Sequence, residues 1–152
     1  MQNIKSPFFD LAIREARLAS KRGEVPVGAV IVEVPTGRVL AKTGNLIEIT
    51  KDPTAHAEIL AIREATNILG TPRLKNCDLY VTLEPCPMCA AAISLARIRR
   101  LYFGAFDPKG GGVDHGPKIY EHPTCHHTPE VYGGIEETLC RRLLKEFFLD
   151  KR

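Results

Sequence analysis

The most constraining feature of this sequence is a pair of cysteines three residues apart, Cys86 and Cys89, with His56 about thirty residues before them. Two cysteines at this spacing and one distant histidine form a three-ligand zinc set. Structural zinc sites are usually closed by four protein ligands, whereas catalytic sites leave one position to water. Because Glu58 is a spare carboxylate two residues from His56, the pattern predicts a catalytic Zn²⁺ site with one ion per chain.

The surrounding sequence predicts that these ligands stand at the starts of two helices. Residues 84–87 have the pattern of a strand that ends and a helix that begins, because proline is favoured in the first helical turn and residues 88–96 are apolar and rich in alanine. Thr54 is the predicted N-cap of the other helix, which places His56 and Glu58 in its first turn. Two helix N-termini are therefore expected to meet at the metal.

The charges of this ligand set favour an ionised water. Two thiolates and a neutral imidazole cancel the charge of Zn²⁺, and the positive helix ends favour both thiolate and hydroxide. A zinc-bound water can reach a pKa of about 7. Glu58 is then the expected catalytic residue, which carries a proton between the water and the substrate.

Each part of the pattern has a simpler interpretation when it stands alone. A single Cys-x-x-Cys can be a redox pair or half of a structural zinc knuckle, and a single histidine is usually packed or solvated. Together, His-x-Glu followed about thirty residues later by Pro-Cys-x-x-Cys is the signature of zinc-dependent nucleobase deaminases. The sequence physics alone therefore predicts a zinc deaminase of an amino-purine or amino-pyrimidine.

The chain resembles the cytidine deaminase superfamily and, most closely, the bacterial tRNA adenosine deaminases. Beyond the zinc ligands, the resemblance rests on residues 24–30, 44–45, 52–58, 80–86 and 103–109, and it covers nearly the whole chain. It implies an α/β fold of the cytidine deaminase-like type, a three-layer α/β/α sandwich with a five-stranded mixed sheet.

The same resemblance implies the reaction and the substrate. The expected activity is hydrolytic deamination of adenosine to inosine at the wobble position of the tRNA anticodon, by a homodimer. The resemblance places substrate contacts at five positions: Asn45, Val27, Ala57, Asp107 and Phe148.

Two alternatives stay open. Guanine deaminases also carry Cys-Pro-Met-Cys and Pro-Thr-Ala-His-Ala-Glu. The zinc motifs are therefore also compatible with a second hypothesis, a deaminase of free guanine or cytosine. Phe106 and the glycines at 110–112 also depart from the pattern of the tRNA enzymes. A non-catalytic, zinc-stabilised RNA-binding subunit is the third candidate, and Glu58 argues against it.

Composition limits the class of protein without fixing its function. A chain of 152 residues is expected to form a single domain over residues 1–152. The net charge of +3 is too small to indicate nucleic-acid binding by itself. No apolar run approaches the roughly 18 residues of a membrane span, so a cytoplasmic location is expected. In that reducing compartment, Cys77 and Cys140 are predicted to be buried thiols.

The remaining sequence alternates helices and strands. Apolar residues at helical spacing predict a first helix from Ser6 to about Gly23 and a last helix over residues 136–149. Four largely apolar runs predict strands, the first of them rich in β-branched residues and the first two forming a hairpin: residues 25–34, 39–43, 78–83 and 101–105. Because a helix joins the last two strands, they are expected to be parallel, with helices on both faces of a mixed sheet.

Three narrower expectations concern packing and loops. In the helix predicted over residues 55–69, the inward face is expected to carry Ile59, Ile62 and Leu69, and Gly28 is expected to leave room for a flat ligand. The segment 115–127 contains His122, Cys125, His126 and His127, which resemble a second metal site but lack a spaced partner. At the C-terminus, Lys151 and Arg152 beside Phe148 have the composition of an RNA contact.

Overall fold

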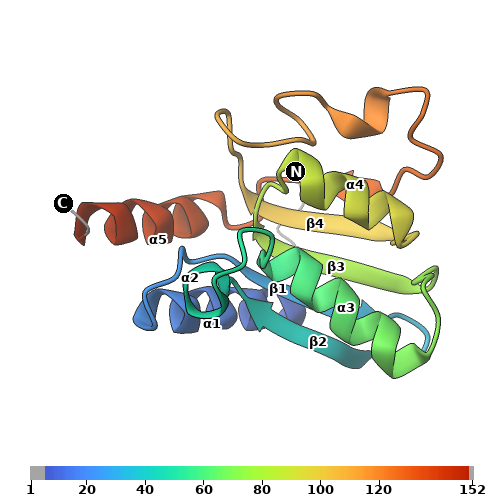
Figure 1. Ribbon diagram of the computed structural model, residues 1–152, viewed down its shortest axis with the longest axis horizontal. Helices are drawn as coiled ribbons and strands as arrows, with labels where there is room; N and C mark the ends of the chain where they lie inside the picture. Colours follow the sequence, from blue (N-terminus) through green and yellow to red (C-terminus); the bar gives the residue numbers. More distant parts are fainter. Residues whose placement is uncertain (1–5, 151–152) are drawn as a thin grey trace.

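The computed structural model describes residues 6–150 and shows five strands and five α-helices among them. The elements follow in the order α1 (Pro7–Lys21), β1 (Gly28–Glu33), β2 (Arg38–Gly44), α2 (Ile47–Thr50), α3 (Ala57–Leu69), β3 (Cys77–Leu83), α4 (Pro87–Leu95), β4 (Arg100–Ala105), the 3-10 turn η1 (Ile119–Glu121), β5 (Glu130–Tyr132) and α5 (Glu137–Asp150) (Figure 1).

The strands form one mixed sheet in the order β2-β1-β3-β4-β5. Strand β1 is antiparallel to both β2 and β3, whereas β3, β4 and β5 are parallel. The predicted hairpin and the predicted parallel pair are therefore confirmed. The fifth strand comprises residues 130–132 at the sheet edge, and no pattern in the sequence located it because three residues are too few to show an alternation.

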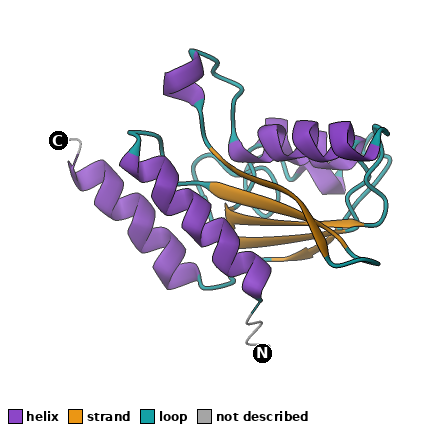
Figure 2. Ribbon diagram, turned by 90° about the horizontal axis from the view of Figure 1, so that it is seen from below, coloured by secondary structure: helices purple, strands orange, loops and turns teal. Residues whose placement is uncertain are grey.

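Helices cover both faces of the sheet, which confirms the predicted three-layer architecture. Figure 2 shows α1 and α5 side by side beneath one face, and α3 and α4 lie on the other. Alternate residues of β1 divide between the two layers: Ala29 and Ile31 pack with α3 and α4, while Val30 and Val32 pack with α1. This division follows from the two-residue period of a strand.

Small residues let the helices approach the sheet closely. The fully buried face of α3 carries Ala57, Ala61 and Ala65, whereas the predicted inward residues Ile62 and Leu69 are only partly buried at the edge of the core. The prediction for this face is corrected because alanines bring the helix nearer to the strands than isoleucines would.

Gly28 has a packing role that differs from its predicted one. A Cβ at this position would lie 2.0 Å from the carbonyl oxygen of Ala12 in α1, so glycine is needed for the helix to cross the strand. The expectation that Gly28 leaves room for a flat ligand stays a prediction. Strand β1 also begins three residues later than predicted, after a tight turn in which the Val27 amide donates to the Val25 carbonyl at 2.8 Å.

The thiols of Cys77 and Cys140 are both free and buried, as predicted. Within residues 6–150, the model contains no helix with the length and apolarity that a membrane crossing requires.

Candidate active site

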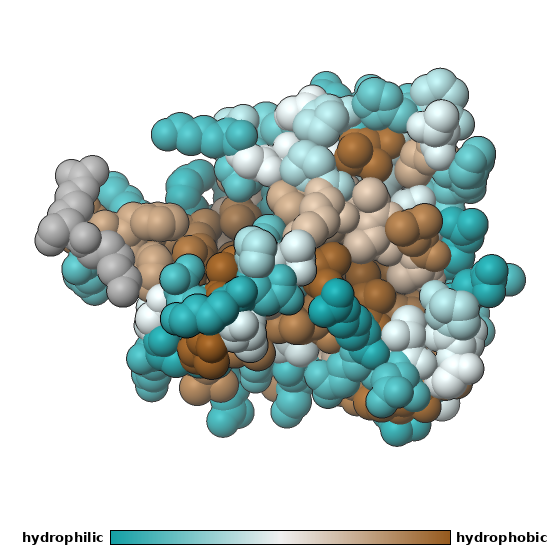
Figure 3. Space-filling view, in the orientation of Figure 1, coloured by the Kyte–Doolittle hydropathy of each residue, from teal (hydrophilic) through white to brown (hydrophobic). Residues whose placement is uncertain are grey.

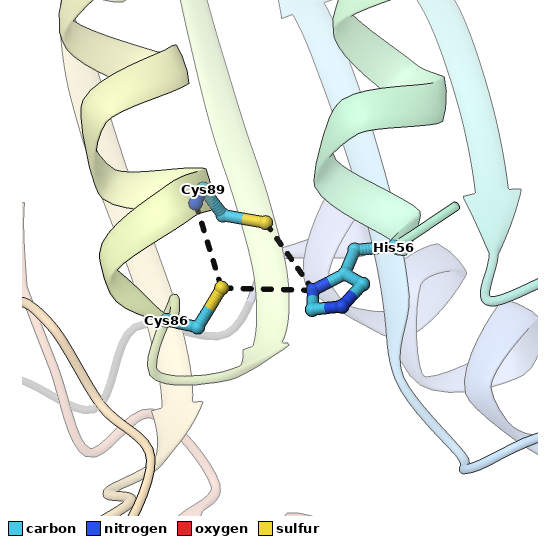
Figure 4. A group of neighbouring side chains, drawn as sticks. All are labelled: His56, Cys86 and Cys89. Carbon is cyan, nitrogen blue, oxygen red and sulfur yellow. Dashed lines mark hydrogen bonds between the residues drawn. The ribbon is translucent and has the colours of Figure 1, made fainter. Parts of the chain in front are cut away.

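His56, Cys86 and Cys89 converge where α3 and α4 begin. Figure 4 shows the three side chains pointing toward one another. Cys89 lies in the first turn of α4, and Cys86 directly precedes this helix. Cys86 is the N-cap of α4, and its Sγ accepts a hydrogen bond from the Cys89 amide at 3.5 Å. Pro87 occupies the first turn, where its missing N–H is not needed. The local sequence thus sets both sulfurs on one side of the helix start.

The spacing of the three donor atoms fits tetrahedral zinc. Nδ1 of His56 lies 3.6 Å from Sγ of Cys86 and 3.5 Å from Sγ of Cys89. With a Zn–N distance of about 2.1 Å and a Zn–S distance of about 2.3 Å, a tetrahedral ion separates nitrogen from sulfur by about 3.6 Å. Within residues 6–150, these three residues are the only cluster with the spacing of a metal site.

The start of α3 is capped by Asn45 and not by Thr54. The helix begins at Ala57 with His56 at the N-cap position, and the His56 side chain makes no capping bond. Instead, Oδ1 of Asn45 accepts a hydrogen bond from the Ala57 amide at 2.8 Å. The hydroxyl of Thr54 donates to Asp52 at 2.7 Å, so the prediction for Thr54 was wrong. Asn45, which is 6% exposed, therefore fixes the residue that follows a zinc ligand.

Hydrogen bonds among the three side chains change the pKa values of the two cysteine thiols. A hydrogen bond from Cys89 lowers the pKa of the Cys86 thiol to about 4, and one from His56 adds to this effect, although burial acts in the opposite direction. The same hydrogen bond, together with burial, raises the pKa of the Cys89 thiol, so Cys86 carries the negative charge and Cys89 keeps its proton in the absence of a metal. Because zinc binds thiolates, its binding would release that proton.

The carboxyl group of Glu58 lies beside this cluster, in the first turn of α3. Glu58 is only 4% exposed to solvent. Burial raises the pKa of Glu58 to about 7, and the nearby Cys86 acts in the same direction. A carboxyl group with this pKa is able to take up and release a proton near neutral pH.

A second carboxylate, Glu84, has a different function. Its Oε1 accepts hydrogen bonds from the Asp107 amide at 2.9 Å and from Nδ1 of His115 at 2.8 Å. Its Oε2 accepts from three successive amides, those of residues 113–115, at 2.9 to 3.2 Å. Glu84 therefore fastens loop 107–115 beside α4. This role of Glu84 was not predicted from the sequence, although an acidic residue directly before Pro-Cys-x-x-Cys was a visible signal.

The other predicted substrate contacts stay predictions. Val27 is buried and its carbonyl accepts from the Asn45 amide at 3.3 Å. The Ala57 amide donates to Asn45, and the residue is fully buried. The half-buried Asp107 accepts from the Gly110 amide at 3.0 Å. Phe148 is 55% exposed.

The aromatic pair at the end of α5 divides between core and surface. Phe147 is buried, and its ring meets that of Phe148 edge-on at 5.3 Å. Lys151 and Arg152, the predicted phosphate contacts beside them, lie outside the described residues.

The histidines and the cysteine of segment 115–127 do not form a second metal site. His122 bonds the Pro117 carbonyl, and His127 bonds the Ile98 carbonyl at 2.6 Å. Cys125 lies 3.3 Å from the hydroxyl of Ser94. These polar atoms bind the backbone or a serine, and among residues 6–150 they form no cluster with the spacing of a metal site.

The fold, the His-Cys-Cys cluster and the buried glutamate together define a zinc-dependent deaminase. A family model described as the cytidine and deoxycytidylate deaminase zinc-binding region matches residues 2–105, and the chain belongs to this family. In particular, the chain is 55% identical over 148 residues to the tRNA-specific adenosine deaminase of Agrobacterium fabrum, a match that covers 97% of this chain and 96% of that protein.

Solved structures agree with this assignment. One from a study of tRNA:A34 deaminases, which edit A to I at the wobble position, has a TM-score of 0.88 and 56% identity over 92% of this chain and 100% of that one. A guanine deaminase from Bacillus subtilis has a TM-score of 0.64 and 34% identity over 82% of each chain. The tRNA deaminases are thus markedly more similar to this chain than that guanine deaminase.

Proposed function

We propose that this protein deaminates adenosine to inosine at the wobble position of a tRNA anticodon. The observation that carries the proposal is the buried Glu58, which interacts electrostatically with Cys86 and His56, two of the three donors spaced for tetrahedral zinc. The choice of tRNA as the substrate is supported by the tRNA-specific relatives, which are 55 to 56% identical to this chain.

His56, Cys86 and Cys89 would hold the metal. When bound there, Zn²⁺ supplies Lewis acidity that makes water reactive at neutral pH. Glu58 takes a proton from the attacking water and delivers it to the adenine ring nitrogen next to the attacked carbon. It then takes the remaining proton from the hydroxyl group added to that carbon and passes it to the exocyclic amine. The C–N bond breaks, the amine leaves as ammonia and the added oxygen becomes the carbonyl of inosine, so that one carboxyl group serves both transfers. Its pKa of about 7 suits this alternation.

Asn45 is suited to hold the base. Its Oδ1 is engaged by the Ala57 amide, so its Nδ2 group remains to donate to an acceptor on the purine edge. The predicted contacts Val27 and Asp107 belong to the same end of the sheet, where β1 begins and β4 ends. An unpaired anticodon base is able to enter such a site at low energetic cost.

We further propose that a second copy of the chain packs on the layer formed by α3 and α4. Exposed apolar side chains are present on both helices: Ile68 is 44% exposed, Met88 37% and Leu95 75%. Figure 3 shows apolar residues gathered on this face. A homodimer would remove them from water. Light scattering after gel filtration tests this proposal, and a monomer at micromolar concentration would contradict it.

The substrate is tested with the zinc-loaded protein, which is incubated separately with tRNA, guanine and cytosine. Mass spectrometry is expected to find inosine in the anticodon loop and no conversion of the free bases. Conversion of guanine to xanthine with intact tRNA would instead assign the protein to the free-base deaminases. A cytoplasmic location, which we also propose, is tested by fractionating cells and assaying each fraction for this activity.

A further inference from the structure

Loop 107–115 is fastened to the start of α4 by contacts that leave no room for larger residues. The Gly112 amide donates to the Pro85 carbonyl at 2.8 Å. A Cβ at Gly112 would lie 2.6 Å from Cα of Pro87, and one at Gly111 would lie 2.4 Å from Oε2 of Glu84. The loop is therefore held against the residues on both sides of Cys86, beside the metal ligands.

The ring of His115 has a fixed orientation on this loop. Its Nδ1 lies 2.8 Å from Oε1 of Glu84, whose side chain is completely buried. The ring also packs edge-on against Phe106, with 6.2 Å between the ring centres. Three backbone amides and one further amide from Asp107 surround the same carboxylate, which keeps it in place.

This hydrogen bond determines which nitrogen of His115 is free. An ionised carboxylate only accepts hydrogen bonds, so Nδ1 carries the proton and donates to Glu84. In the neutral ring, Nε2 is then an acceptor. Within residues 6–150, Nε2 has no hydrogen-bond partner, and the His115 side chain is 34% exposed. The loop therefore presents a rigid acceptor to solvent next to the active site.

We propose that His115 contacts the RNA substrate, and that its Nε2 accepts a hydrogen bond from a ribose 2′-hydroxyl beside the target nucleotide. The sugar-phosphate backbone of RNA is rich in acceptors, and its donor is the 2′-hydroxyl. An oriented acceptor on the protein is complementary to that group. The contact favours RNA over DNA, which lacks this hydroxyl. This proposal rests on the proposed function and names a specificity-determining residue within it.

The test compares His115→Asn with His126→Asn in the zinc-loaded protein. The asparagine amide keeps a donor near the position of Nδ1 but removes the outer nitrogen, and His126 is an exposed histidine of the same segment. Each protein is assayed for kcat/KM and for binding by fluorescence anisotropy. The substrates are an anticodon stem-loop and stem-loops with a single 2′-deoxy sugar at the target or at one neighbouring nucleotide.

We expect His115→Asn to weaken binding of the all-ribose stem-loop about fivefold, the effect of one hydrogen bond. One of the 2′-deoxy substitutions should weaken RNA binding by the wild type to the same degree. The same substitution should not weaken RNA binding by His115→Asn any further. His126→Asn should behave as the wild type. Thermal unfolding and zinc content verify that the variants fold.

Three results would overturn the contact. The first is equal binding by His115→Asn and the wild type. The second is a loss of binding affinity on 2′-deoxy substitution that is as large in His115→Asn as in the wild type at every position. The third needs no variant: a wild type that is insensitive to all single deoxy substitutions. A wild type that converts guanine but leaves the RNA unchanged would overturn the proposed function as well, so the two failures are distinguishable.

Discussion

The carboxylate of Glu84 and the imidazole of His115 are joined by a hydrogen bond of 2.8 Å, although they are about thirty residues apart in sequence. Glu84 stands two residues before Cys86, one of the three proposed zinc ligands, and His115 closes the loop that follows β4. The pair therefore connects the segment that supplies the metal ligands to the segment that carries Asp107. The position of loop 107–115 is therefore set by the buried carboxylate of Glu84 and not by apolar packing alone.

Replacement of Glu84 is expected to give a pH-dependent loss of stability. Burial raises the pKa of Glu84, but hydrogen bonds from Asp107, His115, Asp114 and Val113 lower it further, so the net pKa lies below its ordinary value of 4.5. Its stabilising effect is therefore complete above that value and is lost as the pH falls through the lower, folded pKa.

We expect Glu84→Gln to lower the free energy of unfolding by about 2 kcal/mol at pH 7, because a neutral amide is a weaker acceptor for these donors. The difference between the two proteins should shrink as the pH falls from about 5 to about 3. Urea unfolding at several pH values measures it. A difference that stays constant with pH would show that the charge of Glu84 is not what fastens the loop.

Asn45 has two separable tasks, because its oxygen caps α3 and its amide nitrogen is left for the base. Asn45→Asp keeps an acceptor for the Ala57 amide, and a negative charge is favourable at a helix N-terminus. It should therefore retain stability but lose activity. Asn45→Ala removes the cap as well and should cost about 1 kcal/mol of unfolding free energy. Unfolding curves and inosine formation, measured on both variants, separate the two roles. An active Asn45→Asp protein would exclude the proposed base contact.

Glu58→Gln should retain one zinc per chain and lose turnover by at least about a hundredfold, since general acid-base groups contribute this much or more. Zinc is measured by mass spectrometry of the acid-digested protein and turnover by inosine formation. Glu64→Gln is the matched control, because Glu64 is an exposed residue of the same helix. Turnover of Glu58→Gln equal to that of the control would refute the proton-transfer role.

Reactivity of the cysteines should follow their burial. Burial raises the pKa of Cys77 to about 11 and that of Cys140 to about 12. At pH 8, only about one in a thousand Cys77 thiols is then ionised. In the zinc-loaded native protein, iodoacetamide should modify the half-buried Cys125 first and leave Cys77 and Cys140 intact, as peptide mass spectrometry will show. Early modification of Cys140 would indicate that α5 opens readily from the sheet.

The parts of this site that the sequence predicted correctly are those that depend on local spacing. Cys86 and Cys89 are brought together by one turn of helix, and Pro87 marks where that turn begins. The helix caps were less predictable. Thr54 had the right residue type for an N-cap, but the bond is supplied by Asn45, which lies on the loop after β2 and reaches the helix only through the tertiary fold.

The same distinction applies to the sheet. Strands β1 to β4 are long enough to show apolar runs in the sequence. Strand β5 is held in place by its register with β4, where Leu101 pairs with Val131. The inward face of α3 was misjudged because side-chain hydrophobicity favoured Ile59 and Ile62, while the distance to the sheet selected alanines. The role of Glu84 was overlooked because its hydrogen-bond partners lie 23 to 31 residues away in the sequence.

The hydroxyl of Tyr120 is a buried polar atom in the core beside the site, and its hydrogen bonding can be tested by mutation. Its ring packs against the cluster beneath α3 and α4, and its hydroxyl is buried without a hydrogen-bond partner among the described residues. Burial raises the pKa of Tyr120, and the nearby Cys125 and Cys89 act in the same direction. A buried hydroxyl that makes no hydrogen bond costs about 1 to 3 kcal/mol. Tyr120→Phe removes that atom and keeps the ring, so it should raise the free energy of unfolding by about 1 kcal/mol. Urea unfolding of the zinc-loaded proteins measures the change. A loss of stability would mean that the hydroxyl has a partner in solution, such as a buried water held between η1 and α4.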